Sequence, residues 1–227
     1  MPGDKDFISM LLPQMPMSLG EYMRRCNAQY YDSRDPLGRE GDFITAPEVS
    51  QMFGELIGLW LADYWMKLGQ PSSFVLLECG PGRGTFMSDI LRSFKSVPGV
   101  LDAVNICLLE NSTLLIDKQK KCLQDFDIKH LSSIGDLDDG QPVFIIGNEF
   151  LDALPTEQYK YTGEAWQQKF VQHQDGQLEY AWRAVDDCTC LKPFLDVMRK
   201  PQPDDVMEIS PERVQFVKEC SNILQKN

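Results

Sequence analysis

Histidine is scarce in this chain, and the absence of several short patterns limits its chemistry. Only two histidines, His130 and His173, occur among the 227 residues, and no Cys-x-x-Cys pair accompanies them. Because a zinc site takes about four such ligands, we expect no metal. The seven cysteines are odd in number and several lie in apolar runs, which indicates buried thiols rather than a secreted disulfide framework.

Basic residues are also few. The chain has 22 lysines and arginines against 34 acids, a net charge of −12, and no basic block. This surface would repel a nucleic-acid backbone, so we expect no nucleic-acid partner. No apolar stretch is long enough to span a bilayer, and the N-terminus shows no targeting segment. These features predict a soluble, intracellular protein, and its size and 43% hydrophobic content predict one compact domain.

Strand and helix patterns alternate through the middle of the chain, which predicts a parallel sheet with helices on its faces. The expected elements are strand 74–79, helix 85–95, strand 104–109, helix 112–124, strand 128–131 and strand 143–147. After Pro155 the pattern changes to short strands, and Asp175-Gly176 is typical of a hairpin turn. An antiparallel insertion with strands 157–161, 168–172 and 178–183 is therefore expected.

Three further helices are expected. Ser18 with Glu21, and Thr45 with Glu48, have the spacing of capping boxes, and Ser210-Pro211 begins a last helix to about residue 224. The second of these helices runs to Gly69 and repeats apolar residues at helical spacing, so we expect the whole apolar stripe to pack against the sheet. Its members are Met52, Phe53, Leu56, Ile57, Trp60, Leu61, Tyr64 and Trp65.

A glycine-rich turn follows the strand 74–79 and carries the strongest functional signal. Gly80, Gly82 and Gly84 alternate with other residues, as is typical where backbone passes close to a ligand. A phosphate-binding loop would need Lys-Ser or Lys-Thr here, and a dinucleotide fingerprint would need Gly or Ala in place of Thr85. Glu78 would repel a pyrophosphate but attract an ammonium and a sulfonium. The pattern therefore favours S-adenosylmethionine (SAM), with a purely structural corner as the alternative.

Polar residues end the two neighbouring strands. Glu110 and Asn111 follow strand 104–109, where an acid can accept ribose hydroxyls, although an acid there can also be a solvated terminus. Asn148, Glu149 and Asp152 follow strand 143–147, at the edge of a parallel sheet that faces the ligand. Their amide and carboxylates could hold a guanidinium. The alternative for Asn148 is a helix cap without catalytic role.

Three stretches together resemble the MidA-type SAM-dependent methyltransferases, namely 41–55, 78–84 and 148–155. That family includes a mitochondrial complex I assembly factor that symmetrically dimethylates an arginine of a core subunit, and bacterial relatives of undefined substrate. The resemblance implies a class I methyltransferase fold with a Rossmann-like parallel sheet. It places Asn148 and Glu149 near the acceptor, and together with Asp152 these are the expected catalytic residues. The cofactor-binding set it implies is Glu78, Gly80, Pro81, Gly82, Gly84, Glu110, Asn111, Phe43 and Thr45.

The composition and the pattern along the chain predict an organisation within one compact domain. Its segments are an N-terminal helical part with a cofactor-covering loop (1–70), a SAM-binding core (71–155), an antiparallel insertion (156–209) and a C-terminal helix (210–227). Family members continue beyond such a helix, so we expect the closing part of the sheet to be missing. An unpaired sheet edge would then favour a homodimer.

The activity implied is that of a SAM-dependent protein arginine methyltransferase linked to respiratory complex I assembly. Its partner would be a protein with an acceptor arginine, a complex I core subunit being the candidate. The compartment would be the mitochondrial matrix or the bacterial cytoplasm. Two alternatives stay open: a SAM-fold assembly factor or binding module without turnover, and an NAD-dependent oxidoreductase, which Thr85 and Glu78 disfavour.

Overall fold

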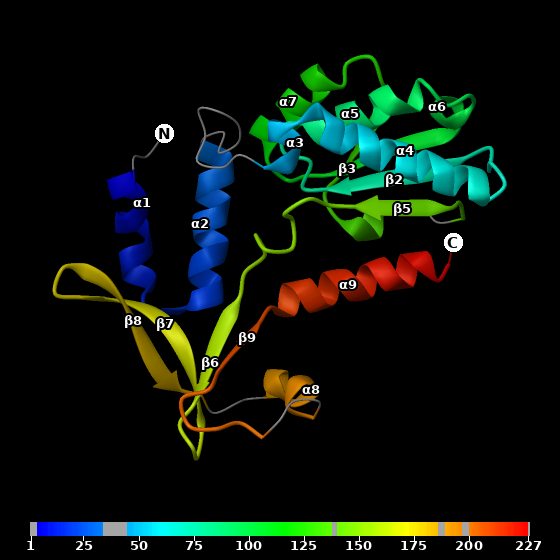
Figure 1. The fold of residues 1–227 in the computed structure, drawn as a ribbon. Helices are drawn as coiled ribbons and strands as arrows, with labels where there is room; N and C mark the ends of the chain where they lie inside the picture. Colours follow the sequence, from blue (N-terminus) through cyan, green and yellow to red (C-terminus); the bar gives the residue numbers. More distant parts are fainter. Residues whose placement is uncertain (1–3, 34–44, 138–139, 186–188, 197–199, 227) are drawn as a thin grey trace. The chain divides into compact units, whose positions relative to one another are not determined.

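The computed structural model describes residues 4–33, 45–137, 140–185, 189–196 and 200–226 (Figure 1). The chain divides into two compact units. The parallel unit comprises Tyr30–Leu151 and Phe216–Asn227, and the antiparallel unit comprises Met1–Gln29 and Asp152–Gln215. The segments expected at 1–70 and 210–227 are thus each divided between the two units. Among the described residues, no helix has the length and apolarity needed to cross a membrane.

The parallel unit contains a four-stranded sheet in the order β4-β3-β2-β5, and all its pairings are parallel. The strands are β2 (Phe74–Cys79), β3 (Val104–Leu109), β4 (Ile128–Leu131) and β5 (Val143–Ile146). Every residue of β2 is buried, as an apolar central strand requires. The predicted parallel sheet is confirmed, and β5 ends one residue earlier than predicted.

Helices cover both faces of this sheet. The parallel unit's helices are α3 (Ala46–Val49), α4 (Gln51–Lys67), α5 (Thr85–Phe94), α6 (Val100–Ala103) and α7 (Thr113–Cys122), with a 3-10 turn at Ile134–Asp136; α9 (Pro211–Leu224) crosses the boundary between units. Residues of α4 and α5 pack with Phe74 and Leu76 in one core cluster. On the other face, Val75 and Leu77 pack in a second cluster with Phe216 of α9.

Two glycines bring α4 and α5 into close contact. A Cβ atom at Gly54 would lie 2.5 Å from Asp89 Cβ. At Gly58 it would lie 2.8 Å from the carbonyl oxygen of Ile90, which is backbone and cannot rotate away. The spacing of four residues places both glycines on the same side of α4. The two helices can therefore lie this close together only because neither position carries a side chain.

The helix expected from Thr45 to Gly69 is broken at Ser50. Ser50 has extended backbone angles (φ −149°, ψ 120°), so α3 and α4 are separate helices. Thr45 does precede α3, but its side chain makes no capping hydrogen bond. The predicted capping box is wrong because the Glu48 carboxylate instead accepts a hydrogen bond from Thr85 Oγ1, at 2.8 Å. A tertiary contact thus replaces the local one.

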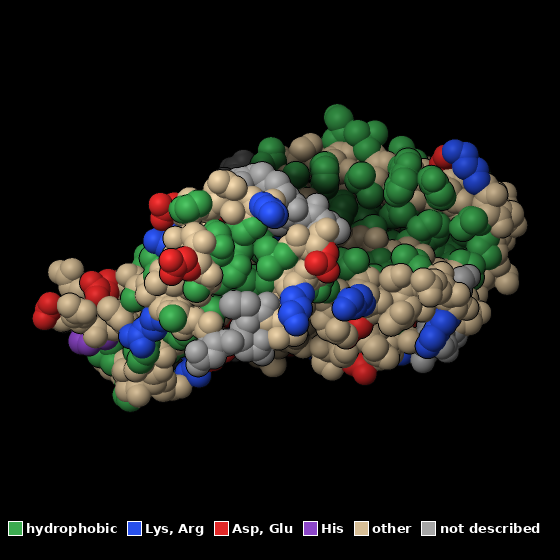
Figure 2. All heavy atoms as spheres, turned by 90° about the horizontal axis from the view of Figure 1, so that it is seen from below, with side chains coloured by type: hydrophobic (Ala, Val, Ile, Leu, Met, Phe, Trp, Pro, Cys, Tyr) green, Lys and Arg blue, Asp and Glu red, His purple; other side chains and the backbone are tan. Residues whose placement is uncertain are grey.

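Only half of the apolar stripe on α4 packs against the sheet. Phe53, Ile57, Leu61 and Trp65 contact the core, as predicted. The adjacent row is exposed: Met52 by 65%, Leu56 by 59%, Trp60 by 52% and Tyr64 by 45%. Our expectation for this second row was wrong, because the two rows point in directions about 100° apart and the sheet covers one. Figure 2 shows a face on which hydrophobic side chains gather over a hollowed area.

The antiparallel unit contains a five-stranded sheet in which β7 pairs with β1, β6 and β8, and β9 pairs with β6. The predicted insertion is confirmed; β1 and β9 were not predicted. The core of this unit includes Tyr159, Leu191, Met207 and Ile209. Its elements are α1 (Asp4–Leu11), a 3-10 turn (Leu12–Gln14), β1 (Met17–Ser18), α2 (Leu19–Ser33, which ends in the other unit), β6 (Glu157–Tyr161), β7 (Trp166–Gln174), β8 (Gln177–Ala184), a 3-10 turn (Thr189–Leu191), α8 (Lys192–Leu195) and β9 (Val206–Ile209).

The turn between β7 and β8 is the predicted hairpin. Gln174 pairs with Gln177, which leaves Asp175 and Gly176 as a two-residue loop. Both have positive φ, 51° and 83° respectively. Two positive φ angles define the type I′ turn, whose twist matches that of the strands. The Asp-Gly pair therefore sets the register of the hairpin.

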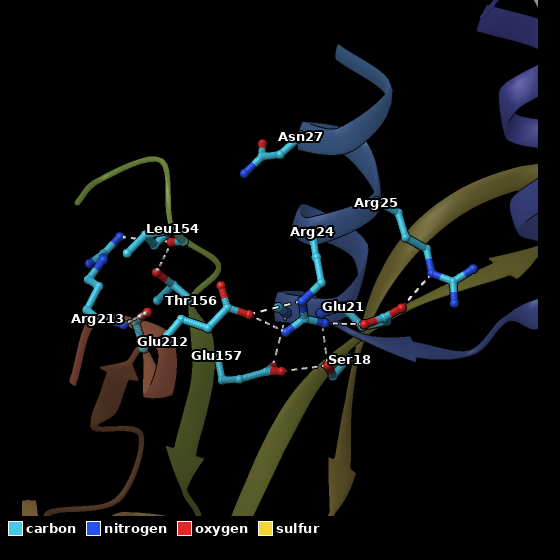
Figure 3. Close-up of polar contacts among 12 residues, drawn as sticks. Ser18, Glu21, Arg24, Arg25, Asn27, Leu154, Thr156, Glu157, Glu212 and Arg213 are labelled. Atoms are coloured by element: carbon cyan, nitrogen blue, oxygen red, sulfur yellow. Dashed lines mark hydrogen bonds and ion pairs between the residues drawn. The ribbon is translucent and has the colours of Figure 1, made fainter. Parts of the chain in front are cut away.

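Polar contacts anchor the start of α2 to β6 (Figure 3). Ser18 Oγ donates to Glu157 Oε1 at 2.6 Å, and the backbone N–H of Gly20 donates to Glu157 Oε2 at 3.1 Å. Ser18 Oγ also accepts from the Glu21 N–H at 3.2 Å, which confirms the Ser18 half of the predicted capping box, whereas the Glu21 carboxylate accepts from Arg25 Nε at 2.6 Å. Arg24 then pairs with Glu212, at 2.6 Å, and so ties α2 to the first turn of α9.

Candidate functional site

The glycine turn lies between β2 and α5 in the parallel unit. Gly80, Gly82 and Gly84 have φ of 65°, 55° and 84°, in the left-handed region that side chains disfavour. At Gly80 there is a second reason for glycine, because a Cβ atom would lie 2.7 Å from Phe150 Cδ2. Phe150 in turn packs on Phe216 of α9, with ring centroids 5.0 Å apart. Backbone conformation and the Phe150 ring together require this glycine pattern.

Glu78 is a buried acid directly before the turn. Its side chain is 2% exposed, and its Oε2 atom has no hydrogen-bond partner among the described residues. Burial raises the pKa of Glu78 to about 8, which a hydrogen bond from the Met87 backbone opposes only in part. A buried polar atom without a partner is costly. A ligand that brings a positive charge to this turn would supply the missing partner, and this fits the ammonium and sulfonium of SAM.

Glu110 and Asn111 lie at the end of β3, where the carboxylate of Glu110 is oriented by neighbouring donors. Its Oε1 accepts from the backbone N–H groups of Asn111 and Ser112, both at 2.9 Å. Its Oε2 accepts from Gln119 Nε2 at 3.2 Å, and the same nitrogen donates to the Gly82 carbonyl at 2.7 Å. Gln119 of α7, which our sequence analysis missed, thus connects the two predicted cofactor-binding segments.

Glu48 is a second residue that the sequence analysis left out of the site. In addition to Thr85, its carboxylate lies 3.9 Å from the Arg83 guanidinium. Arg83 and Thr85 flank Gly84, so α3 is attached directly to the glycine turn. The capping-box spacing predicted a local role for Glu48, but its side chain contacts the glycine turn and not its own helix.

The end of β5 presents Asn148 and Glu149 in an irregular segment. Glu149 has a φ of 52°, which is uncommon for a residue with a side chain and recurs at functional positions. Its side chain is exposed, and Asn148 is half-buried. No helix follows Asn148 before Pro155, so the alternative of a helix cap is wrong. The structure brings these two residues together beside the strand that precedes the glycine turn, since β5 pairs with β2.

Asp152 belongs to the antiparallel unit, whereas Asn148 and Glu149 belong to the parallel unit. There the chain is held by its carbonyl groups: Arg213 Nη2 donates to the carbonyls of Asp152 and Leu154, both at 3.2 Å. Asn27 Nδ2 donates to the carbonyl between them, that of Ala153, at 2.6 Å. The segment is therefore fixed by its backbone. Phe43 lies outside the described residues, and Thr45 precedes α3.

Comparison with known proteins identifies the family. Residues 56–227 match a family model described as "Putative S-adenosyl-L-methionine-dependent methyltransferase". This chain belongs to that methyltransferase family. The resemblance found from the sequence is thereby confirmed, and SAM is the cofactor of the family.

One relative is Protein arginine methyltransferase NDUFAF7, mitochondrial, from Danio rerio. It is 38% identical to this chain over 194 residues, and the alignment covers 74% of this chain and 46% of the relative. The Bos taurus protein of the same name is 32% identical, covering 91% of this chain and 52% of its own. The chain spans about half the length of these curated relatives. A Burkholderia thailandensis crystal structure bound to S-adenosyl-homocysteine has a TM-score of 0.78 at 21% identity, covering 98% of this chain and 62% of its own, and shares the fold.

Proposed function

We propose that this chain binds SAM at the glycine turn and transfers its methyl group to an arginine side chain of a protein. The observation that carries the proposal is Glu78, whose buried Oε2 atom lacks a partner within the described residues, directly before a turn of three positive-φ glycines. Membership of a SAM-dependent methyltransferase family supports the cofactor. The names of the relatives support arginine as the acceptor.

The two segments that Gln119 connects would each bind a different part of the cofactor. Glu78, with Gly80, Pro81, Gly82 and Gly84, would hold the methionine part, where a carboxylate attracts its positive groups. Glu110 would accept the ribose hydroxyls, and the two amide donors on its Oε1 atom keep the carboxylate oriented for this role. Asn111, Phe43 and Thr45 remain proposed members of the site from the sequence.

The acceptor roles belong to the end of β5. When bound, SAM would supply a methyl group whose bond to sulfur breaks as the bond to the acceptor nitrogen forms, and neutral S-adenosylhomocysteine would leave. The chain must then align an acceptor nitrogen with it, and alignment alone can contribute several kcal/mol. Glu149 offers exposed carboxylate oxygens that can hold a guanidinium in a forked pair, and Asn148 can fix its second edge. Asp152 stays a candidate on sequence grounds.

We further propose a mitochondrial setting, with a complex I core subunit as acceptor protein. The relatives' names specify mitochondrial proteins, which supports the compartment. The family resemblance supports the acceptor subunit and its symmetric dimethylation. A homodimer remains a prediction from the sheet edge.

Parallel calorimetric titrations with S-adenosylhomocysteine (SAH) and NAD test the cofactor. We expect SAH to bind and NAD not to bind; the reverse result would overturn the proposal. Transfer is then measured with radiolabelled SAM and arginine peptides, comparing Glu149→Gln with Glu164→Gln, an exposed acid in the β6–β7 loop. Glu149→Gln should keep SAH binding and lose transfer, while Glu164→Gln should keep both.

Normal turnover in Glu149→Gln would remove the acceptor role of this residue. SAH binding by the unmodified protein without transfer to any arginine peptide would instead favour an assembly factor or binding module that uses the same fold.

A further inference from the structure

Gln119 occupies a core position of α7 that would ordinarily take an apolar residue. It is fully buried, with 0% exposure, and lies in one row with Leu115 and Leu123, which are 3% and 1% exposed. Burying an amide is unfavourable unless its donors and acceptor are satisfied. Here the amide nitrogen and the amide oxygen both have partners, so the donor and the acceptor of each hydrogen bond can be identified.

The partners of Gln119 fix the orientation of its amide. The Gly82 carbonyl can only accept, so the group 2.7 Å from it must be the Gln119 nitrogen, whose other hydrogen reaches Glu110 Oε2 at 3.2 Å. The amide oxygen then faces His130 Nε2 at 2.9 Å. Because that oxygen can only accept, the imidazole must carry a hydrogen on Nε2. The hydrogen-bond network Gly82–Gln119–His130 therefore has a single consistent assignment of donors and acceptors.

We propose that Gln119 is a positioning residue that holds the glycine turn and the Glu110 carboxylate in a fixed arrangement for the methionine and ribose parts of the cofactor, with His130 orienting its amide. The inference rests on the proposed function, since it concerns cofactor binding. The Gln119 amide nitrogen donates to both segments, to the Gly82 carbonyl and to Glu110 Oε2. Gln119 also packs against the turn itself, because its Cα and Cγ atoms would lie 3.5 Å from a Cβ atom at Gly84.

The charges around Gln119 are consistent with this role. Glu110 faces it from the end of β3 and His130 from β4, and Lys120 follows it on α7. Burial and the charge of Lys120 lower the pKa of His130, so the imidazole is neutral at physiological pH and donates from Nε2. A neutral donor on this side leaves the Glu110 carboxylate as the negative group of the network.

The test compares Gln119→Met, which removes the amide at similar volume, with Gln124→Met, the same change at an exposed position of the chain after α7. Loss of hydrogen bonds to a carbonyl and a carboxylate should weaken SAH binding by roughly ten- to hundredfold in calorimetry. Gln124→Met should bind SAH like the unmodified protein. Affinity for Gln119→Met within twofold of this control would overturn the proposal.

Two further measurements separate positioning from simple structural support. In Gln119→Glu the new carboxyl can donate to Gly82 only when protonated, so its SAH affinity relative to the unmodified protein should recover as the pH falls. Nitrogen NMR of the ligand-free protein should show His130 in the Nε2–H form, and an Nδ1–H form would contradict the hydrogen-bond pattern. If Gln119→Met does not fold, His130→Leu replaces it, with an expected loss of roughly threefold in SAH affinity; an unchanged affinity there would also overturn the proposal.

Failure of the proposed function has a different signature. If the unmodified protein does not bind SAH, the cofactor assignment falls, and the role of Gln119 toward the cofactor falls with it. If the unmodified protein binds SAH and the Gln119 variants bind it equally well, only the positioning role is overturned.

Discussion

Replacing Glu78 by glutamine should stabilise the ligand-free protein, and the gain should depend on pH. The carboxylate is buried before the glycine turn, and burial raises its pKa from the ordinary 4.5 to about 8. Between these two values the unfolded chain has released the proton that the folded chain still binds. The free energy of unfolding therefore falls as the pH rises from 4.5 to 8 and is level beyond it.

The magnitude follows from the same two values. Each pH unit between them corresponds to about 1.4 kcal/mol, so charging Glu78 in the folded state costs at most about 5 kcal/mol. Relaxation of the surroundings reduces this, and we expect a measured difference of about 2–5 kcal/mol between Glu78→Gln and the unmodified protein at pH 8. Well below pH 4.5 the difference should be close to zero, because Glu78 is then neutral in both states, as glutamine is.

Urea denaturation followed by circular dichroism at several pH values measures this difference. Glu164→Gln is the matched control, because its exposed side chain should leave the pH dependence unchanged. A pH dependence in Glu78→Gln parallel to that of the unmodified protein would refute the reasoning. It would mean that Glu78 is hydrated or has a partner in solution, and the main support for a cationic ligand at this turn would be lost.

Four other substitutions test the packing of each unit by urea denaturation. Gly58→Ala should cost about 1–3 kcal/mol because the added methyl group meets the α5 backbone, whereas Leu56→Ala on the exposed row should change stability by less than about 0.5 kcal/mol; equal effects would contradict the packing. Gly176→Ala should cost about 1–2 kcal/mol through its positive φ alone, since nothing lies within 4 Å; no loss would argue against the turn. Arg24→Met breaks half-exposed ion pairs and should cost under about 1 kcal/mol, and a loss above about 2 kcal/mol would show a tighter anchor.

The parallel sheet could be predicted because each strand is a short apolar run that ends in turn residues. The predicted bounds of β2, β3, β4 and β6 agree with the structure. The Asp175-Gly176 turn was predictable for the same local reason. In contrast, β1 and β9 have two and four residues, and each exists only through pairing with a distant strand. No local pattern identifies such strands.

The functional site also combines residues that a local pattern predicts with contacts that only the fold brings about. Glu78, the glycines and Glu110 follow from a local strand–turn pattern, but the partner of Glu48 is Thr85, which is distant in sequence. Gln119 did leave a signal, since it interrupts an otherwise apolar row between Leu115 and Leu123. A polar residue at such a position needs buried partners, and only the fold shows that these are Gly82, Glu110 and His130.

The two rows of α4 give this helix two optical reporters with different surroundings. Trp65 is 3% exposed and its indole N–H donates to the Pro71 carbonyl at 3.0 Å, whereas Trp60 is 52% exposed and lies beside Tyr64. An aqueous quencher such as acrylamide should therefore reach Trp60 and spare Trp65. Any molecule that covers the exposed row would shift the Trp60 emission to shorter wavelength, and unfolding of the sheet would shift the Trp65 emission to longer wavelength. One helix can thus report surface occupation and core integrity separately.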